Sequence, residues 1–285
     1  MSLLESILSP IEKMPDIKFS VVMSVYRSDN SKHLEESIQS VLSQSIPPDE
    51  VILVVDGPVS QSLECVISAF SKNTNFHVIR LSINLGPGLA RNKGIVSAKN
   101  NIIAIMDADD ICRDIRFEKE LQFMKELNVD VVGGLIDEFR KMPGDTKQVR
   151  RVPEKHAQIF SRGKWKMPVN HVTLMFRKDA YMQVGGYSNF RYAEDYDLVV
   201  RMLSKGFKFY NVQDILVDVR IGNNAYDRRR GMSCLHNELK VIRKMFLIRY
   251  INITQYVINI VLRVFTRLMP KFFISFLYRN FLRNQ

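Results

Sequence analysis

Four short apolar segments, separated by stretches long enough for helices, constrain the fold of this 285-residue chain most strongly. Each segment is rich in Val, Ile and Phe, and its apolar residues run continuously instead of alternating with polar ones. Such runs are typical of strands that are covered on both faces, as in a parallel sheet. The expected strands are residues 19–26, 51–55, 76–81 and 102–106, with crossover helices over 33–43, 60–71 and 88–98. The alternation predicts an α/β fold with a mostly parallel central sheet flanked by helices.

Polar, turn-forming residues follow each expected strand. In open α/β sheets, ligands bind at the carboxyl ends of the strands, so these residues are the candidates for a site. They are residues 27–29, 56–58, 84–88 and 107–110. No GxGxxG follows the first strand and no GxxxxGK[ST] occurs in the chain, which disfavours a dinucleotide-binding Rossmann enzyme and a P-loop enzyme.

Three carboxylates stand within four residues after the fourth strand, at Asp107, Asp109 and Asp110. Such a group repels itself and favours a cation, and hard oxygen ligands suit Mg²⁺ or Mn²⁺ bound together with substrate phosphates. An acidic turn that caps a helix beginning near Asp114 explains the same residues, and the motif alone does not decide between the two.

Five segments in order resemble glycosyltransferases of family 2, which have the GT-A fold. They read Ser-Val-Val-Met-Ser-Val-Tyr, Val-Ile-Leu-Val-Val-Asp-Gly-Pro, Asn-Leu-Gly-Pro-Gly-Leu-Ala-Arg-Asn, Ile-Met-Asp-Ala-Asp-Asp and Ala-Glu-Asp-Tyr-Asp-Leu. The resemblance covers residues 19–220. It is nearest to bacterial enzymes that build O-antigen and other surface polysaccharides on undecaprenyl diphosphate. It implies an inverting transferase. The Gln-x-x-Arg-Trp motif of processive synthases does not follow the last segment, which favours an enzyme that adds a single hexose.

The resemblance also implies roles for residues at the strand ends. Ser24 and Tyr26 match the nucleotide-binding end of the first strand. Asp56 matches the acidic residue that recognises the uracil or the ribose, although a turn-forming Asp before Gly-Pro is the alternative. Arg91 matches a base or phosphate contact, against a solvated charge on a helix. Asp107 and Asp109 match the DxD motif: Asp109 is the expected direct ligand of Mn²⁺ or Mg²⁺, and Asp107 lies nearer the ribose.

Glu194 and Asp195 match the family's ED motif at the start of a helix, whose Asp is the general base. Inverting transfer needs one carboxylate to remove a proton from the acceptor hydroxyl, and Asp195 is expected to do so. The alternative is that both acidic residues only favour the helix N-terminus electrostatically.

Two further residues are weaker candidates for acceptor or phosphate contacts. His171 is one of them, with a structural histidine as the alternative. Arg220 is the other, with a surface ion pair as the alternative.

Charge divides the chain. The net charge is +11, but nine basic residues and no acidic ones lie in residues 240–285, so residues 1–239 carry only +2. The expected organisation is an N-terminal extension (1–18), a catalytic domain (19–239, with a nucleotide-binding half 19–135 and an acceptor-binding half 136–239) and a basic amphipathic helical tail (240–285). Basic amphipathic segments are typical of membrane-surface binding. A helix packed on the catalytic domain or in a homo-oligomer is the alternative, and nucleic acid is disfavoured because no recognition motif occurs.

Together these features predict a cytoplasmic enzyme, peripheral on the inner membrane. No apolar run approaches the roughly 20 residues of a membrane span, and three widely spaced cysteines support neither disulfides nor a zinc site. The expected donors are UDP-galactose and UDP-glucose. The expected acceptor is a lipid-diphosphate-linked N-acetylhexosamine, with a β-1,3 link to GlcNAc-diphospho-undecaprenol favoured. The alternatives are a sugar-phosphate nucleotidyltransferase, which lacks its Gly-rich signature here, and a non-catalytic basic binding module.

Overall fold

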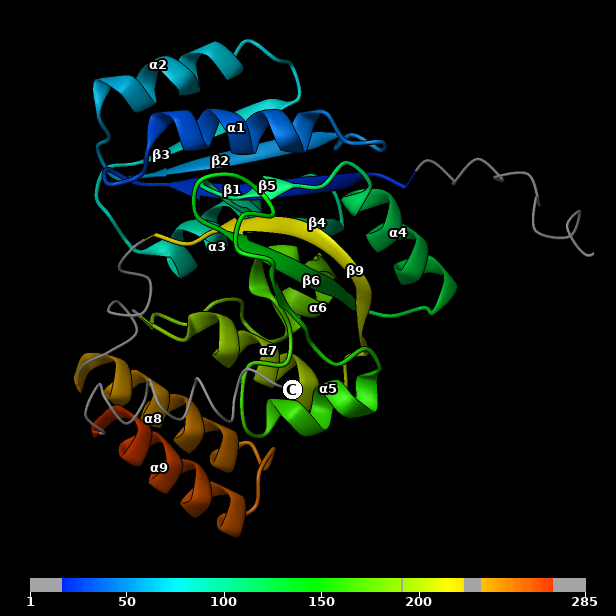
Figure 1. The fold of residues 1–285 in the computed structure, drawn as a ribbon, viewed down its shortest axis with the longest axis vertical. Coiled ribbons are helices and arrows are strands. Elements are labelled where there is room, and N and C mark those ends of the chain that lie inside the picture. The colour runs from blue at the N-terminus through cyan, green and yellow to red at the C-terminus, as the bar shows by residue number, and fades with distance from the viewer. Residues whose placement is uncertain (1–16, 191, 223–231, 269–285) are drawn as a thin grey trace, which may run out of the picture.

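A computed structural model describes residues 17–190, 192–222 and 232–268 (Figure 1). Residues 1–16 of the expected extension and 269–285 of the expected tail lie outside the described part. The first half contains β1 (Phe19–Val25), α1 (Ser31–Leu42), β2 (Glu50–Asp56), α2 (Gln61–Phe70), β3 (Phe76–Leu81), α3 (Pro87–Ser97), β4 (Ile102–Asp107), β5 (Ile111–Cys112) and α4 (Arg116–Glu126). The second half contains β6 (Val131–Phe139), β7 (Gln148–Arg150), α5 (His156–Gly163), the 3₁₀ helix η1 (His171–Thr173), β8 (Met175–Arg177), α6 (Lys178–Gln183), α7 (Glu194–Ser204), β9 (Phe209–Arg220), α8 (Met232–Leu247) and α9 (Ile253–Leu268).

The described strands form one sheet in the order β3-β2-β1-β4-β8-β6-β9-β5, with β7 paired to β6. The four expected strands are mutually parallel, and β1 lies between β2 and β4. Beyond β4 the sheet becomes mixed, because β8 runs antiparallel to both β4 and β6 while β6 and β9 are parallel. The predicted α/β fold is confirmed, and it places the ends of β1, β2 and β4 at one edge.

Apolar side chains form a core on each face of the sheet. One core contains Leu34 and Ile38 of α1 and Phe117 of α4 against β1 and β2. The other lies under α3, α5, α7 and α8 (Figure 1). Helix α3 comes especially close to the strands, because a Cβ at Gly94 would lie 2.6 Å from Val22 Cγ1. The close packing sets the distance between α3 and the sheet and therefore the position of Arg91, which lies on α3.

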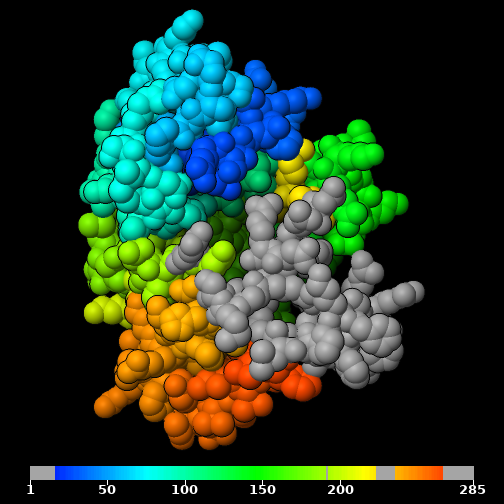
Figure 2. All heavy atoms as spheres, turned by 90° about the vertical axis from the view of Figure 1, so that its left-hand side faces the viewer, coloured from blue at the N-terminus to red at the C-terminus, as the bar shows by residue number. Residues whose placement is uncertain are grey.

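The two helices at the start of the expected basic tail have different environments. Helix α8 buries Val241, Ile242 and Met245 in the second core, so this part of the tail packs on the catalytic domain. Helix α9 packs Tyr256 and Ile260 against the same core but presents other apolar side chains to solvent, and Val257 and Phe265 are 51% and 61% exposed. The two helices lie at the end of the molecule opposite α1 and α2 (Figure 2). No helix in the described ranges is long and apolar enough to cross a membrane.

A fully buried ion pair supports the strand ends from within the first core. Arg116 and Glu120 are both 0% exposed, and their side chains are 3.2 Å apart at Nε and Oε1. Arg116 also donates to the carbonyl of Ile105 (2.8 Å) in β4 and to the sulfur of Cys112 (3.2 Å) in β5. It therefore connects the two strands that flank residues 107–110.

Replacing Glu120 with Gln is expected to lower the free energy of unfolding by about 3–5 kcal/mol, because it leaves the Arg116 charge buried without a carboxylate. Urea denaturation measures the difference. Glu126→Gln, at an exposed position of the same helix, is the control and should change stability by less than about 0.5 kcal/mol. Equal stabilities for the two variants would contradict the assigned role of the pair.

Candidate active site

The first candidate residues lie where β1 and β4 end side by side. Ser24 pairs in register with Asp107, and the main chain of β2 passes on its other side at Val54. Tyr26 is the first residue after β1 and is 40% exposed, and its backbone N–H donates to the Asp29 carboxylate (2.9 Å). The parallel register therefore brings Ser24, Tyr26 and Asp107 to one edge, as the sequence predicts.

Asp56 ends β2 and is used by the neighbouring loop. Its two carboxylate oxygens accept the backbone N–H groups of Leu85 (2.7 Å) and Gly86 (2.9 Å), and only 3% of the residue is exposed. Asp56 thus fixes the loop that leads into α3, where Gly86 has φ +90°. Nucleotide recognition by Asp56 stays a prediction, since these contacts support the structural alternative.

Arg91 and Asp107 form a short ion pair at the centre of the edge. Arg91 Nη2 lies 2.5 Å from Asp107 Oδ1, and only 7% of Arg91 is exposed. The Nε of Arg91 is buried without a hydrogen-bond partner. The Arg91 charge opposes the effect of burial and holds the pKa of Asp107 below its ordinary value. Arg91 is therefore a buried partner of the DxD motif and not a solvated charge.

The loop after Asp107 is held by Arg220, the last residue of β9. Its backbone N–H donates to the buried Asp110 carboxylate (2.8 Å), and its Nε donates to the carbonyl of Asp109 (3.1 Å). Its guanidinium pairs with Glu36 (2.7 Å) and lies over the Phe139 ring, 4.6 Å from the centroid. Arg220 thus forms the ion pair that the alternative expects. It also holds the loop that carries the exposed Asp109.

The loop supplies too few protein ligands to hold a metal ion without oxygen atoms from a substrate. Among the residues that the structure describes, no three His, Cys, Asp or Glu side chains are arranged to hold a metal. One oxygen of Asp107 is already paired with Arg91, so the exposed Asp109 would be the main protein ligand of such an ion. Mg²⁺ and Mn²⁺ commonly bind through one or two carboxylates plus substrate phosphates, so the donor set suits a cation that arrives with a diphosphate.

The two acidic residues of the ED motif begin α7. Ala193 before them has left-handed backbone angles (φ +64°, ψ +22°), a strained conformation for a residue with a side chain. Asp195 accepts the backbone N–H of Tyr196 (2.7 Å). Burial, and then the charge of Asp195, raise the pKa of Glu194 to about 7. A Cβ at Gly88 would lie 3.1 Å from Glu194 Cγ, so the start of α3 packs closely against Glu194.

His171 lies near both groups of carboxylates. Burial and the charge of Arg91 lower the pKa of His171 to about 4, while Asp195 and Asp107 act in the opposite direction. The ring is therefore neutral at pH 7, and its Nε2 lies 2.7 Å from the Tyr187 hydroxyl. The structure places His171 at the junction between the DxD and ED motifs.

Two side chains of this region were missed by sequence reasoning. Tyr187 is 2% exposed, and Asn92 binds both its backbone groups, accepting the N–H (2.9 Å) and donating to the carbonyl (2.8 Å). Asn92 is visible in the sequence only as the residue after Arg91. Tyr187 follows Gly185-Gly186, but no pattern at that position distinguishes it from a core aromatic residue.

A buried ionic cluster holds α7 against α8. Asp197 is 1% exposed, and its carboxylate contacts Lys244 Nζ (2.7 Å), Arg201 Nε (2.8 Å) and Ser188 Oγ (2.6 Å). Lys244 also donates to Ser188 (3.0 Å). One cation of the basic segment is therefore committed to the helix that begins with Glu194 and Asp195.

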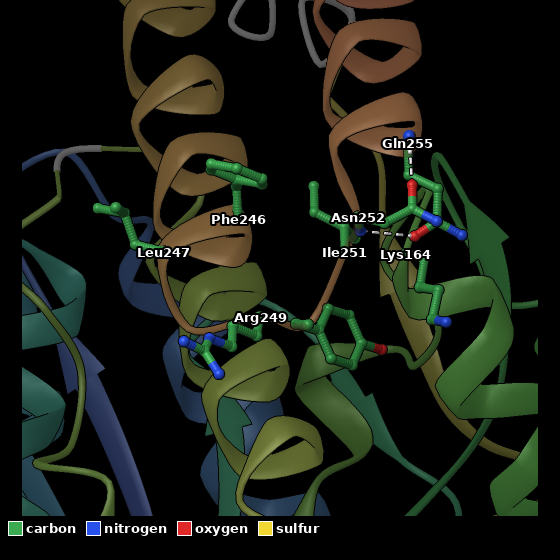
Figure 3. A pocket seen from close by; sticks show the side chains of 8 residues that line it. Lys164, Phe246, Leu247, Arg249, Ile251, Asn252 and Gln255 are labelled. Carbon is green, nitrogen blue, oxygen red and sulfur yellow. Dashed lines mark hydrogen bonds between the residues drawn. The ribbon is translucent and has the colours of Figure 1, made fainter.

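A cavity of about 580 Å³ lies away from these carboxylates, at the corner between α8 and α9 (Figure 3). Phe246, Leu247 and Ile251 supply apolar walls, and Lys164 and Arg249 supply positive charge. Arg249 makes the turn with φ +58°. The cavity therefore belongs to the apolar and basic surface of α8 and α9, not to the candidate active site.

The raised pKa of Glu194 predicts a pH effect on stability. Between about pH 4.5 and about pH 7 the native protein holds a proton on Glu194 that the unfolded chain has released, so stability falls as the pH rises through this window. Over this window Glu194→Gln should lose less free energy of unfolding than the wild type, and the difference should be on the order of 1–3 kcal/mol. Urea denaturation at about pH 5 and about pH 8 measures this, with Glu126→Gln as control. Parallel profiles for wild type and Glu194→Gln would contradict the assigned burial.

Comparison with known proteins agrees with this geometry. The model of the family described as "Glycosyl transferase family 2" matches residues 20–185. The chain is 35% identical to "UDP-Gal:alpha-D-GlcNAc-diphosphoundecaprenol beta-1,3-galactosyltransferase" of Escherichia coli, over 93% of this chain and 97% of that protein. It is 34% identical to "Amylovoran biosynthesis glycosyltransferase AmsE" of Erwinia amylovora, over 92% and 98% of the two chains.

The fold also has a counterpart among solved structures. The structure of S. aureus TarS 1–349 in complex with UDP-GlcNAc superposes with a TM-score of 0.67 at 18% identity, over 88% of this chain and 73% of that chain. At this identity the likeness shows the GT-A fold alone. With the match over residues 20–185 and two full-length relatives above 30% identity, the chain belongs to glycosyltransferase family 2.

Proposed function

We propose that this glycosyltransferase moves a single hexose, galactose or glucose, from a UDP-sugar to a lipid-diphosphate-linked N-acetylhexosamine, with inversion at the anomeric carbon. The proposal includes a β-1,3 link to GlcNAc-diphospho-undecaprenol, in the synthesis of an O-antigen or related polysaccharide. The observation that carries it is the 35% identity, over nearly the whole of both chains, to the E. coli enzyme named for this galactosyl transfer. Purified protein with UDP-galactose or UDP-glucose and a synthetic GlcNAc-diphosphate-lipid, with Mn²⁺ or with EDTA, tests donor, acceptor and metal together.

The donor is assigned to the carboxyl ends of β1, β2 and β4, which together form the donor edge. Tyr26 is exposed beside the strand ends and offers a ring for the base, and Ser24 lies in register with Asp107. The Arg91 ion pair fixes the Asp107 carboxylate, and Arg220 fixes the loop that carries Asp109. A divalent cation held by Asp109 and the diphosphate would neutralise the charge that develops on the leaving UDP.

The proton of the acceptor hydroxyl is assigned to Asp195. In inverting transfer the hydroxyl attacks the anomeric carbon from the face opposite the leaving diphosphate, so one base must lie on the acceptor side. Asp195 begins α7, next to the buried Glu194, and its charge reaches His171. Asp195 is assigned as the base because it matches the Asp of the ED motif, and Glu194, whose pKa burial raises to about 7, is the alternative.

The acceptor's lipid suggests a position on the cytoplasmic face of the inner membrane. Helix α9 exposes the apolar side chains of Ile253, Val257, Val261 and Phe265 at helical spacing, and Leu247 at the end of α8 is also exposed. Lys240 and Arg243 on α8 and Arg249 in the turn after it are exposed as well. Apolar side chains bordered by cations favour binding to the surface of an anionic bilayer. A second copy of the chain is the alternative occupant of the face.

Asp195→Asn is expected to lower the rate of transfer by about 10²–10⁴-fold, because the amide cannot accept the acceptor's proton. The affinity for UDP should barely change, since the donor edge is untouched. Steady-state kinetics and calorimetry separate the two effects. Transfer at the wild-type rate by Asp195→Asn, combined with an inactive Glu194→Gln, would assign the base to Glu194.

The double variant Val257→Glu and Val261→Glu should weaken binding to vesicles that contain anionic lipid by more than about tenfold, because each exposed valine loses its burial in the bilayer. Vesicle sedimentation measures it. Val96→Glu is the control, because Val96 is 58% exposed on α3, outside the two C-terminal helices. Unchanged vesicle binding, with the double variant monomeric where the wild type is dimeric, would favour the second copy.

A further inference from the structure

His171 and Tyr187 connect the donor edge to the start of α7. The charges of Asp107, on the donor side, and Asp195, on the acceptor side, both act on the His171 ring. The rings of His171 and Tyr187 meet edge to face, with centroids 5.7 Å apart. The pair therefore lies between the DxD motif and the ED motif.

The backbone and the Cβ of Tyr187 are fixed by contacts with α3. Asn92 of α3 binds its backbone N–H and its carbonyl, and the Cβ of Tyr187 lies 3.3 Å from the position that a Cβ at Gly88 would take. Since α3 also carries Arg91, one helix fixes both Tyr187 and the partner of Asp107. The hydroxyl is thus placed by the same helix that organises the donor edge.

The direction of the hydrogen bond between the two side chains decides which nitrogen of the neutral His171 ring carries the proton. A buried phenol hydroxyl needs an acceptor, and in the described part of the chain the one that Tyr187 meets is Nε2 of His171, at 2.7 Å. A neutral imidazole carries one proton, so when Nε2 accepts a hydrogen bond, the proton is on Nδ1. Within the same described residues, Nδ1 makes no hydrogen bond to the protein.

A second N–H in this region also lacks a protein partner. The Nε of Arg91 is buried without a hydrogen bond, although Nη2 of the same side chain binds Asp107. A buried donor without a partner costs about 1–3 kcal/mol, so the arrangement favours a ligand that brings acceptor oxygens. A phosphate group presents such oxygens.

We propose that Tyr187 holds His171 in the Nδ1-protonated form and that this N–H donates a hydrogen bond to a diphosphate oxygen of the nucleotide-sugar donor. The identity of that donor rests on the proposed function, whereas the protonated nitrogen does not. Tyr187 is a positioning residue, since it acts through His171. The neutral ring adds direction to diphosphate binding and leaves charge neutralisation to other groups.

The protonated nitrogen is measured directly by long-range ¹H–¹⁵N correlation spectra of ¹⁵N-histidine-labelled protein without substrate, with His171→Gln identifying the resonance. The expected spectrum shows His171 with the proton on Nδ1. In Tyr187→Phe, which removes only the hydroxyl, both neutral forms should appear. A proton on Nε2 in the wild type would overturn the proposal without involving any variant or any donor.

UDP and uridine binding, measured by calorimetry, test the contact with the diphosphate. Tyr187→Phe and His171→Gln should each weaken UDP binding by about 3- to 10-fold, the contribution of one hydrogen bond, and leave uridine binding unchanged. His171→Asn places an amide nitrogen near the position of Nδ1 and should bind UDP more tightly than His171→Gln. The double variant Tyr187→Phe and His171→Gln should be no weaker than His171→Gln alone, because Tyr187 acts through His171.

Tyr250→Phe is the matched control, because the Tyr250 hydroxyl is also buried and donates to a carbonyl, that of Phe160 (2.7 Å), far from the donor edge. It should leave UDP binding unchanged. Equal UDP affinity in His171→Gln and wild type, with a raised KM for the acceptor, would overturn the diphosphate contact and assign His171 to the acceptor. If the wild type binds no UDP while Nδ1 carries the proton, the proposed donor fails and the role of Tyr187 in fixing the ring stands.

Discussion

The buried ion pair between Arg91 and Asp107 is the interaction on which the site depends. The carboxylate at the end of β4 lies 2.5 Å from Arg91 and compensates its charge in a place with little water. The pair also ties α3 to the sheet, and α3 in turn fixes the backbone of Tyr187 and packs against Glu194. One electrostatic contact therefore aligns the donor edge with the start of α7, and breaking it would leave a buried charge without compensation.

The second half of the chain carries the ED motif and connects it to the C-terminal helices. Asp197 binds Lys244 of α8, so the helix that begins with Glu194 and Asp195 is held by the segment that leads to the apolar face of α9. In the proposed function that face rests on a bilayer, and the same contact then orients Glu194 and Asp195 relative to the membrane. The basic residues of this segment thus have different environments. Lys244 forms a structural ion pair with Asp197, whereas Arg243 and Arg249 are exposed.

The sequence predicts the parts of this structure that depend on local pattern. Continuous apolar runs locate β1 to β4 within one residue at each end, and Asp56 and Asp107 lie at the carboxyl ends of β2 and β4. Contacts between distant segments leave no such signal. The Asn92–Tyr187 and Asp197–Lys244 contacts join residues far apart in the chain. The amphipathic pattern of α8 and α9 predicts an apolar face on each, but not that α8 turns inward and α9 outward.

The anomeric configuration of the product tests the central claim most directly. The account assigns a single displacement, with Asp195 on the acceptor side and UDP leaving from the opposite face of the sugar. Transfer from an α-linked UDP-hexose to a GlcNAc-diphosphate-lipid, followed by proton NMR of the isolated product, should show one new hexose in β-linkage. A new hexose in α-linkage would contradict the account, because retention needs a different arrangement of catalytic groups at the sugar.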